Sequence, residues 1–333
     1  MQQQNEKIAK GFVALMAVLM SFVALSIDAM MPALGTIGRD FGVANPNHVQ
    51  FVISSIFLGM GAGLMLFGPF SDAWGRKPAL YIGISIFLFG CILAIFSRSF
   101  EMLIVGRLFQ GFGAASCRVV TLALIRDKYR SNQMAKVMSF IMIIFIMVPA
   151  FAPSIGQGIL YIAHWRFIFV FILVLGMLGS VWLFFGQQET LHAENRIPFS
   201  KKRIWQGLVE TLQHDTTWRY MVASGLVFGA LIGYLSSAQQ ILQIKYNLGD
   251  KFAIAFGVLA LMVGIASFAN TKWVDRFGME VLCKKALQML TSISGVFLLF
   301  TIYYHGVPPL FFLLGFLGIS FFCFGLLFGN FNA

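Results

Sequence analysis

Long runs of hydrophobic residues, separated by short polar segments, cover most of the chain. A helix needs about 20 apolar residues to cross a bilayer. We therefore predict ten membrane-spanning helices, at 11–38, 49–70, 78–97, 102–125, 137–163, 167–188, 220–244, 252–271, 286–304 and 306–333. The first run contains one acidic residue and the fourth contains two arginines, whereas the last run is charge-free and reaches the final residue.

The connections between the runs divide the chain unequally. The longest is the polar segment 189–219, which follows the sixth run. We expect a six-helix N-terminal bundle at 1–188, a linker at 189–219 and a partial C-terminal bundle of four helices at 220–333. Within the linker, residues Trp205–Leu212 are expected to form a short amphipathic helix at the membrane surface. The predicted fold class is an all-α integral membrane bundle.

Composition narrows the range of functions. Only 11% of residues are charged, 59% are hydrophobic and the mean hydropathy is +0.82. A soluble domain is usually about a quarter charged, so this composition excludes a soluble enzyme, a disordered protein and a nucleic-acid module. The four cysteines stand singly in apolar runs, and no group of residues has metal-ligand spacing, so no disulfide or metal site is expected.

The net charge of +11 reflects orientation in the membrane rather than a nucleic-acid partner. If the N-terminus lies in the cytoplasm, 17 of the 24 Lys and Arg residues fall on the cytoplasmic side and five on the other, with two inside the membrane. Cytoplasmic loops carry an excess of positive charge. We therefore predict a multi-pass inner-membrane protein with a cytoplasmic N-terminus.

Asp28, in the first run, is a candidate for proton coupling. An ionised carboxylate in hydrocarbon costs several kcal/mol, which it avoids by binding a proton or by pairing with a cation. Arg107 and Arg118, in the fourth run, are 11 residues apart and therefore share one helix face. That face must meet protein or water, and we expect Asp28 to pair with one of the two arginines. The alternatives are a solvated Asp28 at the helix end and an Arg118 that reaches the inner interface.

A polar turn recurs at the same place in both halves. Gly68, Asp72, Gly75, Arg76 and Lys77 lie in the loop after the second run, and Asp275-Arg276-Phe277-Gly278 lies in the loop after the eighth. Both contain Asp-x-x-Gly, at an offset of 203 residues. Such repeats are common in transporters. Gly75 suits a tight turn, and the charged side chains are expected to pair with neighbouring helix ends. The alternative is that Arg76 and Lys77 only keep the loop on the cytoplasmic side of the membrane.

Two further sets of residues have weaker signals. Pro149, Pro153 and Gly156 in the fifth run interrupt hydrogen bonding and allow close backbone approach, as a pivot between bundles would require. Ordinary packing is the alternative. Phe57, Gln110, Tyr234 and Gln239 combine aromatic surface with polar groups, as the cavity of a drug transporter would.

The motifs together resemble one family. The segment from Gly68 to Lys77 resembles the G-x-x-x-D-x-x-G-R-[RK] loop of the major facilitator superfamily. In order along the chain, further similarities to its drug:proton antiporters are Ser26-Ile-Asp28-Ala-Met-Met-Pro32, Arg107-Leu-Phe-Gln110-Gly111, Pro149-Ala-Phe-Ala-Pro153-Ser-Ile-Gly156, His164-Trp165-Arg166 and Glu189-Thr190-Leu191. The chain is most similar to the bicyclomycin/chloramphenicol-resistance (Bcr/CflA) subfamily.

The resemblance implies specific roles. It favours Arg107 over Arg118 as the partner of Asp28, makes the Asp72–Lys77 cluster a gating latch, and assigns the Pro149–Gly156 segment to the antiporter motif. Members of the subfamily have twelve helices, so we expect this ten-helix chain to lack the last two.

The expected function is proton-coupled efflux of small amphipathic drug-like compounds by alternating access, in a monomer. The proton gradient supplies the energy and no cofactor is required, because the sequence has no Walker-type loop and no pair of catalytic groups. Two alternatives stay open at this point. One is a facilitator of a small metabolite, and the other is a shortened remnant that inserts without transporting.

Overall fold

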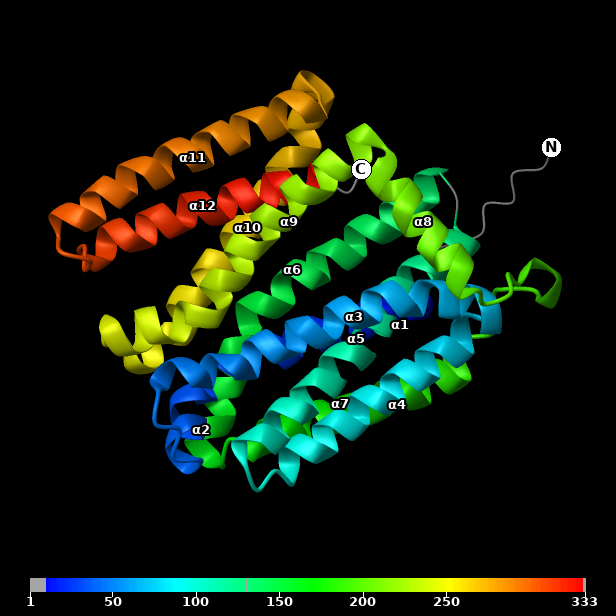
Figure 1. The fold of residues 1–333 in the computed structure, drawn as a ribbon, viewed down its shortest axis with the longest axis horizontal. Helices are drawn as coiled ribbons and strands as arrows, with labels where there is room; N and C mark the ends of the chain where they lie inside the picture. The colour runs from blue at the N-terminus through cyan, green and yellow to red at the C-terminus, as the bar shows by residue number, and fades with distance from the viewer. Residues whose placement is uncertain (1–9, 130, 332–333) are drawn as a thin grey trace. The chain divides into compact units, whose positions relative to one another are not determined.

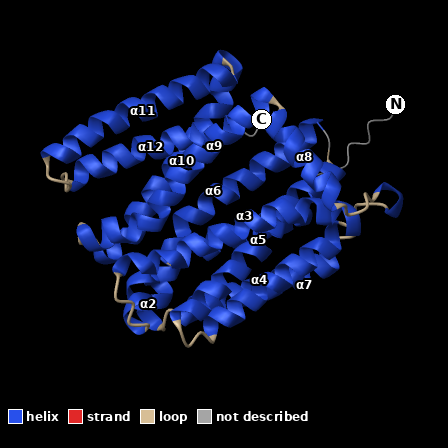
Figure 2. Ribbon diagram, viewed as in Figure 1, coloured by secondary structure: helices blue, strands red, loops and turns tan. Residues whose placement is uncertain are grey.

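The computed structural model describes residues 10–129 and 131–331, and these are helical almost throughout, with no strand among them (Figure 2). The ends of the predicted first and last domains, at 1–9 and 332–333, lie outside the described residues. Within the described part, nine helical stretches are long and apolar enough to span a membrane. A further helix, α6 (Ser131–Ile162), has 32 residues and covers the predicted fifth run. The predicted all-helical membrane fold is confirmed.

The long helices follow the predicted order (Figure 1). In the first part of the chain they are α1 (Lys10–Asp28), α3 (Phe51–Trp74), α4 (Arg76–Ile95), α5 (Phe100–Lys128), α6 and α7 (Arg166–Gly186), with the short helices α2 (Leu34–Asp40), η1 (Met31–Ala33) and η2 (Pro46–Gln50). After a 3₁₀ turn, η3 (Ala193–Asn195), the linker forms α8 (Lys201–Gln213), which confirms a helix at Trp205–Leu212. There follow α9 (Asp215–Ala238), η4 (Gln239–Lys245), η5 (Gly249–Lys251), α10 (Phe252–Phe277), α11 (Met279–Tyr303) and α12 (Leu310–Phe331).

The first predicted span is not one continuous helix. The α-helix α1 ends at Asp28, and a 3₁₀ turn that begins at Met31 leads into α2. Pro32 explains the interruption, because a proline has no N–H to donate and its ring clashes with the carbonyl four residues earlier, which here belongs to Asp28. The span predicted at 11–38 corresponds to the membrane-length helical stretch Gly11–Asp40, but within this stretch the α-helix is interrupted after Asp28.

The described chain divides into two compact units. One comprises Met1–Val148 with Ala152–Gly207, and the other comprises Pro149–Phe151 with Leu208–Ala333. In the first unit α5 lies between α3 and α4, with α1 against its side and α7 against α4 (Figure 1). In the second unit α12 packs along α10 and α11.

The two halves repeat the same turn. Gly75 separates α3 from α4 with φ 109° and ψ 159°, and Gly278 separates α10 from α11 with φ 80° and ψ 155°. Both N–H groups donate to the carbonyl four residues earlier, Gly75 to Ser71 at 3.1 Å and Gly278 to Val274 at 2.9 Å. Positive φ favours glycine. The 203-residue repeat is therefore confirmed at the level of backbone geometry.

Close packing of α3 on α5 provides a stability test. A Cβ atom at Gly59 would overlap the carbonyl oxygen of Leu108 in α5, whereas a Cβ at Gly61 meets nothing within 4 Å. We expect Gly59→Ala to destabilise the protein by about 1–3 kcal/mol, because two backbones must move apart. Gly61→Ala, the matched control in the same helix, should leave stability unchanged or slightly higher. Melting temperatures of the detergent-solubilised variants measure the difference, and equal values would contradict this packing.

Candidate functional site

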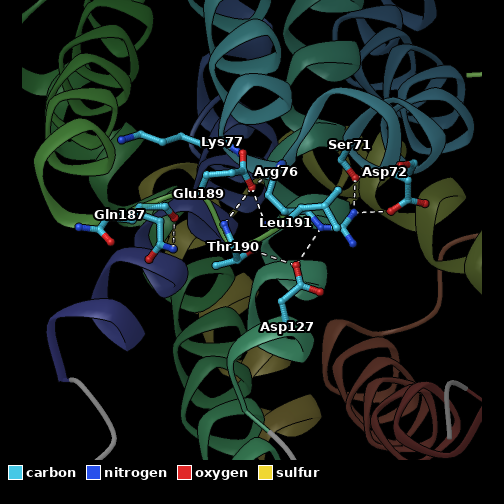
Figure 3. Close-up of polar contacts among 11 residues, drawn as sticks. Ser71, Asp72, Arg76, Lys77, Asp127, Gln187, Glu189, Thr190 and Leu191 are labelled. Atoms are coloured by element: carbon cyan, nitrogen blue, oxygen red, sulfur yellow. Dashed lines mark hydrogen bonds and ion pairs between the residues drawn. The ribbon is translucent and has the colours of Figure 1, made fainter. Parts of the chain in front are cut away.

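Arg76 forms the centre of a polar cluster where α3 turns into α4. Its side chain is almost buried, with 9% of the residue exposed. The Nε atom donates to Asp127 at the end of α5 at 3.0 Å, and one terminal nitrogen donates to the Ser71 hydroxyl at 2.8 Å and forms an ion pair with Asp72 (Figure 3). One guanidinium thus joins the ends of α3, α4 and α5. Arginine stays protonated and its planar group suits such multiple contacts.

Glu189, the third residue after α7, caps the start of α4. Its Oε1 accepts the backbone N–H of Arg76 at 3.0 Å, and its Oε2 accepts that of Lys77 at 2.9 Å. Oε1 also accepts the N–H groups of Thr190 and Leu191, at 2.9 and 3.0 Å (Figure 3). The first N–H groups of a helix lack partners within the helix, and the N-terminus attracts negative charge. One carboxylate therefore stabilises both the helix end and the beginning of the linker.

Gly75 makes this cap possible in two ways. Its positive φ is the conformation that side chains disfavour, and a Cβ at this position would lie only 2.6 Å from Oε2 of Glu189. A larger residue at position 75 would therefore both strain the turn and push the carboxylate away from α4.

Lys77 provides the opposite interaction at the end of α7. Its Nζ donates to the carbonyl of Phe184 at 3.0 Å, in the last turn of α7, and lies 5.3 Å from the ring centroid of the same residue. A cation at a helix C-terminus interacts favourably with the macrodipole. Lys77 thus places a cation at the C-terminal end of α7, and Glu189 places an anion at the N-terminal end of α4. This pairing of charged side chains with helix ends was expected from the sequence.

The linker is bound to the turn at two more points. The Thr190 hydroxyl donates to Asp127 at 2.9 Å, and the Ile197 N–H donates to the carbonyl of Asp72 at 3.0 Å. The ring of Phe199 stacks on Trp74, with centroids 5.4 Å apart. The α3–α4 turn and the first part of the linker therefore form one connected block, which we call the turn–linker cluster.

Sequence reasoning found part of this cluster. Asp72, Gly75, Arg76 and Lys77 are all in it, but Gly68 lies inside α3, because the helix continues through Pro69 to Trp74. The set that was not assigned to this cluster consists of Ser71, Asp127, Glu189 and Thr190, of which Glu189 and Thr190 were noted only as part of a motif after α7. One signal was available: α4 has no acidic residue in its first turn, so its N–H groups require an acceptor from elsewhere in the chain.

Arg107 is a second, fully buried centre. It has no exposed surface, and its donors reach two backbone carbonyls, of Val52 in α3 at 2.9 Å and of Ser26 in α1 at 2.8 Å. A third donor reaches Oε1 of Gln110 at 2.8 Å, and the guanidinium carbon lies 5.7 Å from the ring centroid of Phe169 in α7. The charge is therefore surrounded by polar oxygens and an aromatic face contributed by four helices.

Asp28 does not pair with an arginine in this structure. It is 4% exposed, and among the described residues no hydrogen bond or ion pair of its carboxyl group is found. The expected contact with Arg107 is replaced by the Ser26 carbonyl, two residues earlier in α1. The interruption at Pro32 explains this, because the last carbonyls of a helix lack partners within the helix and can accept from a side chain. Arg118, 11 residues further along α5, is half-buried.

The candidate pivot segment touches the same region. Helix α6 continues through Pro149 and Pro153, and a Cβ at Gly156 would overlap the carbonyl oxygen of Ala29, the residue after Asp28. The helix that carries the antiporter-like motif thus meets the end of α1 backbone to backbone. Whether the segment acts as a pivot stays a prediction.

The four candidate cavity residues are divided between the two units. Gln110 is fully buried and its amide bonds Arg107 and the Sγ of Cys91, at 2.8 and 2.9 Å, so here it supports the arginine. Phe57 lies on α3 and is half-buried. In the second unit, the Tyr234 ring packs edge-on against Phe321, and its buried hydroxyl has no partner among the described residues. Gln239, 5% exposed, begins the π-helical turn η4.

Comparison with known proteins relates these features to a family. Residues 15–333 match the Major Facilitator Superfamily. The bicyclomycin resistance protein homolog of Haemophilus influenzae is 30% identical over 291 residues, which cover 87% of this chain and 73% of that protein. The multidrug resistance protein MdtM of Escherichia coli K12 is 28% identical over 194 residues, which cover 58% of this chain and 47% of MdtM.

Solved structures agree on the architecture. The xylose transporter XylE from E. coli, in a partially occluded inward open conformation, superimposes with a TM-score of 0.68 at 14% identity, covering 95% of this chain and 81% of XylE. The human organic anion transporter MFSD10 superimposes with a TM-score of 0.66 at 15% identity, covering 95% and 85%. At such identities the likeness concerns the fold alone. The family match over nearly the whole length decides the assignment: the chain belongs to the Major Facilitator Superfamily.

Proposed function

We propose that this chain is a proton-coupled exporter of small amphipathic drug-like compounds. The observation that carries the proposal is the buried carboxyl group of Asp28, at the interrupted end of α1, without a partner among the described residues. The names of the bicyclomycin and multidrug resistance relatives support the substrate class. We place the protein in a bacterial inner membrane with its N-terminus in the cytoplasm, as a monomer that uses the proton gradient and no bound cofactor.

The proposed coupling step depends on where Asp28 lies. A carboxyl group in this dry environment is favourable when it carries a proton, since an isolated carboxylate would have neither water nor a cation beside it. Arg107 bonds the backbone only two residues away. When water or substrate enters, loss of the proton creates a carboxylate near a permanent cation, and outward release of substrate allows the proton to return. Functional intramembrane acids behave in this way.

The turn–linker cluster is proposed as the gating element at the cytoplasmic end. Its ion pairs and hydrogen bonds hold the ends of α3, α4 and α5, together with the linker, as one block of the first unit. Alternating access requires such blocks to move as rigid bodies. Loss of a single member should therefore alter the opening equilibrium as well as stability.

Replacing Asp28 tests the coupling. We expect Asp28→Asn to reduce pH-gradient-driven dye efflux from proteoliposomes to the level of empty vesicles, because the amide cannot bind and release a proton. Insertion and melting temperature should be retained, since the amide is uncharged and of nearly the same size as the protonated carboxyl group that the proposal places there. Asp215→Asn is the matched control, because Asp215 is exposed and pairs with Arg219 on the surface, at 3.2 Å.

Three other outcomes would count against the proposal. Undiminished gradient-driven efflux by Asp28→Asn would exclude Asp28 from the mechanism. Wild-type efflux that a protonophore does not change would indicate a facilitator, and no efflux under any gradient would indicate a chain that does not transport.

Replacing Glu189 tests the turn–linker cluster. Glu189→Gln places an amide N–H₂ against a backbone N–H and removes the charge at the start of α4, so we expect a loss of about 2 kcal/mol of stability. Faster proteolysis of the linker should accompany it. Glu194→Gln is the control, because Glu194 lies five residues further along the same linker with an exposed side chain. Equal melting temperatures and cleavage rates for the two variants would show that the cap does not hold the linker.

A further inference from the structure

We infer that the linker helix α8 is a docking surface for anionic lipid headgroups. The helix is amphipathic, with Ile204, Trp205, Leu208, Val209 and Leu212 recurring at helical spacing. At about 100° per residue these five side chains occupy one arc of about 140°, which runs from Ile204 through Trp205 to Val209. The arc is only partly covered by protein, because Trp205 is 68% exposed and Leu212 is 48% exposed.

The position of α8 in the chain holds this arc near the bilayer. A single residue, His214, separates α8 from the spanning helix α9, as can be followed in Figure 1. The junction is hydrogen-bonded on both sides, from the His214 N–H to the Glu210 carbonyl at 3.1 Å and from the Trp218 N–H to the His214 carbonyl at 3.0 Å. Exposed Trp218 and Tyr220 in the first turns of α9 are the residues typical of a membrane–water interface. The apolar arc of α8 therefore lies within reach of lipid.

The charges of α8 indicate which lipids. Lys201, Lys202 and Arg203 form its first turn, where the helix macrodipole disfavours cations, and no acidic residue is present there. Within the described part of the chain, their exposed side chains form no hydrogen bond or ion pair. Unlike Arg76, which pairs with Asp72 and Asp127, these cations thus have no anion within the described protein. An anion outside the protein would explain why three cations occupy the first turn of α8.

The arrangement around the helix axis fits a headgroup layer. Lys202 lies about 60° from Trp205, at the edge of the apolar arc beyond Val209, and Lys201 lies about 40° from Trp205 on the other side, within the arc at its N-terminal end. Both long side chains can therefore extend from the apolar arc to phosphates. Arg203 lies about 160° away, beside the sole acidic residue of α8, Glu210, on the face that points away from Trp205. Cations next to the arc and the acid opposite it favour an anionic membrane surface over a zwitterionic one.

The test uses the full chain in lipid nanodiscs of phosphatidylcholine with increasing phosphatidylglycerol. Part of the lipid carries bromine on the acyl chain close to the headgroup, which quenches nearby tryptophan. The difference between each protein and its Trp205→Phe counterpart isolates the signal of Trp205. We expect bromolipid to quench Trp205, acrylamide in solution to quench it poorly, and the bromolipid effect to increase with phosphatidylglycerol.

Matched charge variants test the role of Lys202. Lys202→Gln should reduce the phosphatidylglycerol-dependent increase by about twofold or more, whereas Arg203→Gln, with the same charge loss in the same turn, should change it less. Inorganic phosphate at equal ionic strength should have no effect, which distinguishes a lipid surface from a free anion.

Two results would overturn the inference. A Trp205 that stays accessible to acrylamide and insensitive to bromolipid at every lipid composition would show that the arc faces water or a protein partner. Bromolipid quenching that is equal in neutral and anionic discs would show that the lysines do not select headgroup charge.

Discussion

A permanently charged guanidinium enclosed within the first unit is the constraint on which the rest of the structure depends. Arg107 cannot lose its charge, and a buried charge is tolerated only if its donors are satisfied. The chain provides backbone carbonyls from α1 and α3 and the amide oxygen of Gln110. These carbonyls can lie within hydrogen-bond distance of Arg107 only if the backbones of α1 and α3 lie close to α5. Glycines at the α3–α5 contact, such as Gly59 against Leu108, allow this close approach. Packing and electrostatics therefore impose the same helix spacing.

The use of carbonyls rather than a carboxylate leaves the charge of Arg107 without an anionic partner among the described residues. An arginine paired with an aspartate would be neutral and stable, whereas Arg107 retains its full positive charge beside the end of α1. Asp28 lies two residues after Ser26, whose carbonyl accepts from Arg107. Gly156 of α6 packs against Ala29, the residue after Asp28. In the proposed coupling step, water that reaches this point would alter the balance between a proton on Asp28 and attraction to Arg107. The turn–linker cluster differs, because Arg76 is fully matched by Asp72 and Asp127 and is suited to holding helices together.

Much of the fold, but less of the site, could be predicted from the sequence. In lipid, a run of about 20 apolar residues forms a helix because the helix satisfies all backbone hydrogen bonds within the segment. The long helices therefore lie at the hydrophobic runs of the sequence. The break after Asp28 could also have been predicted from the sequence, because Pro32 cannot donate a hydrogen bond to the carbonyl of Asp28, four residues earlier. The π-helical turn at Gln239 has no comparable local signal. The role of Glu189 could not be predicted for a different reason. It lies more than a hundred residues along the chain from the N–H groups that it caps, and no sequence periodicity relates a linker residue to a distant helix end.

The internal repeat shows how one backbone supports two kinds of contact. Gly75 and Gly278 have nearly the same turn geometry, 203 residues apart. At the same offset, Asp127 of α5 corresponds to Asn330 of α12 and Arg76 corresponds to Met279. Asn330 instead forms a reciprocal amide pair with Asn270 of α10, with N–O distances of 2.8 and 3.2 Å.

This difference separates the two units chemically. An amide pair is neutral and local, so it fixes the register of α10 against α12 without attracting other charges. The ionic cluster of the first unit is sensitive to charge and recruits the linker, through Thr190 on Asp127. The repeat thus preserves the turn that positions the helices. Among the side chains that the structure describes at the two turns, the ionic cluster around Arg76 lies in the unit that also contains Asp28 and Arg107.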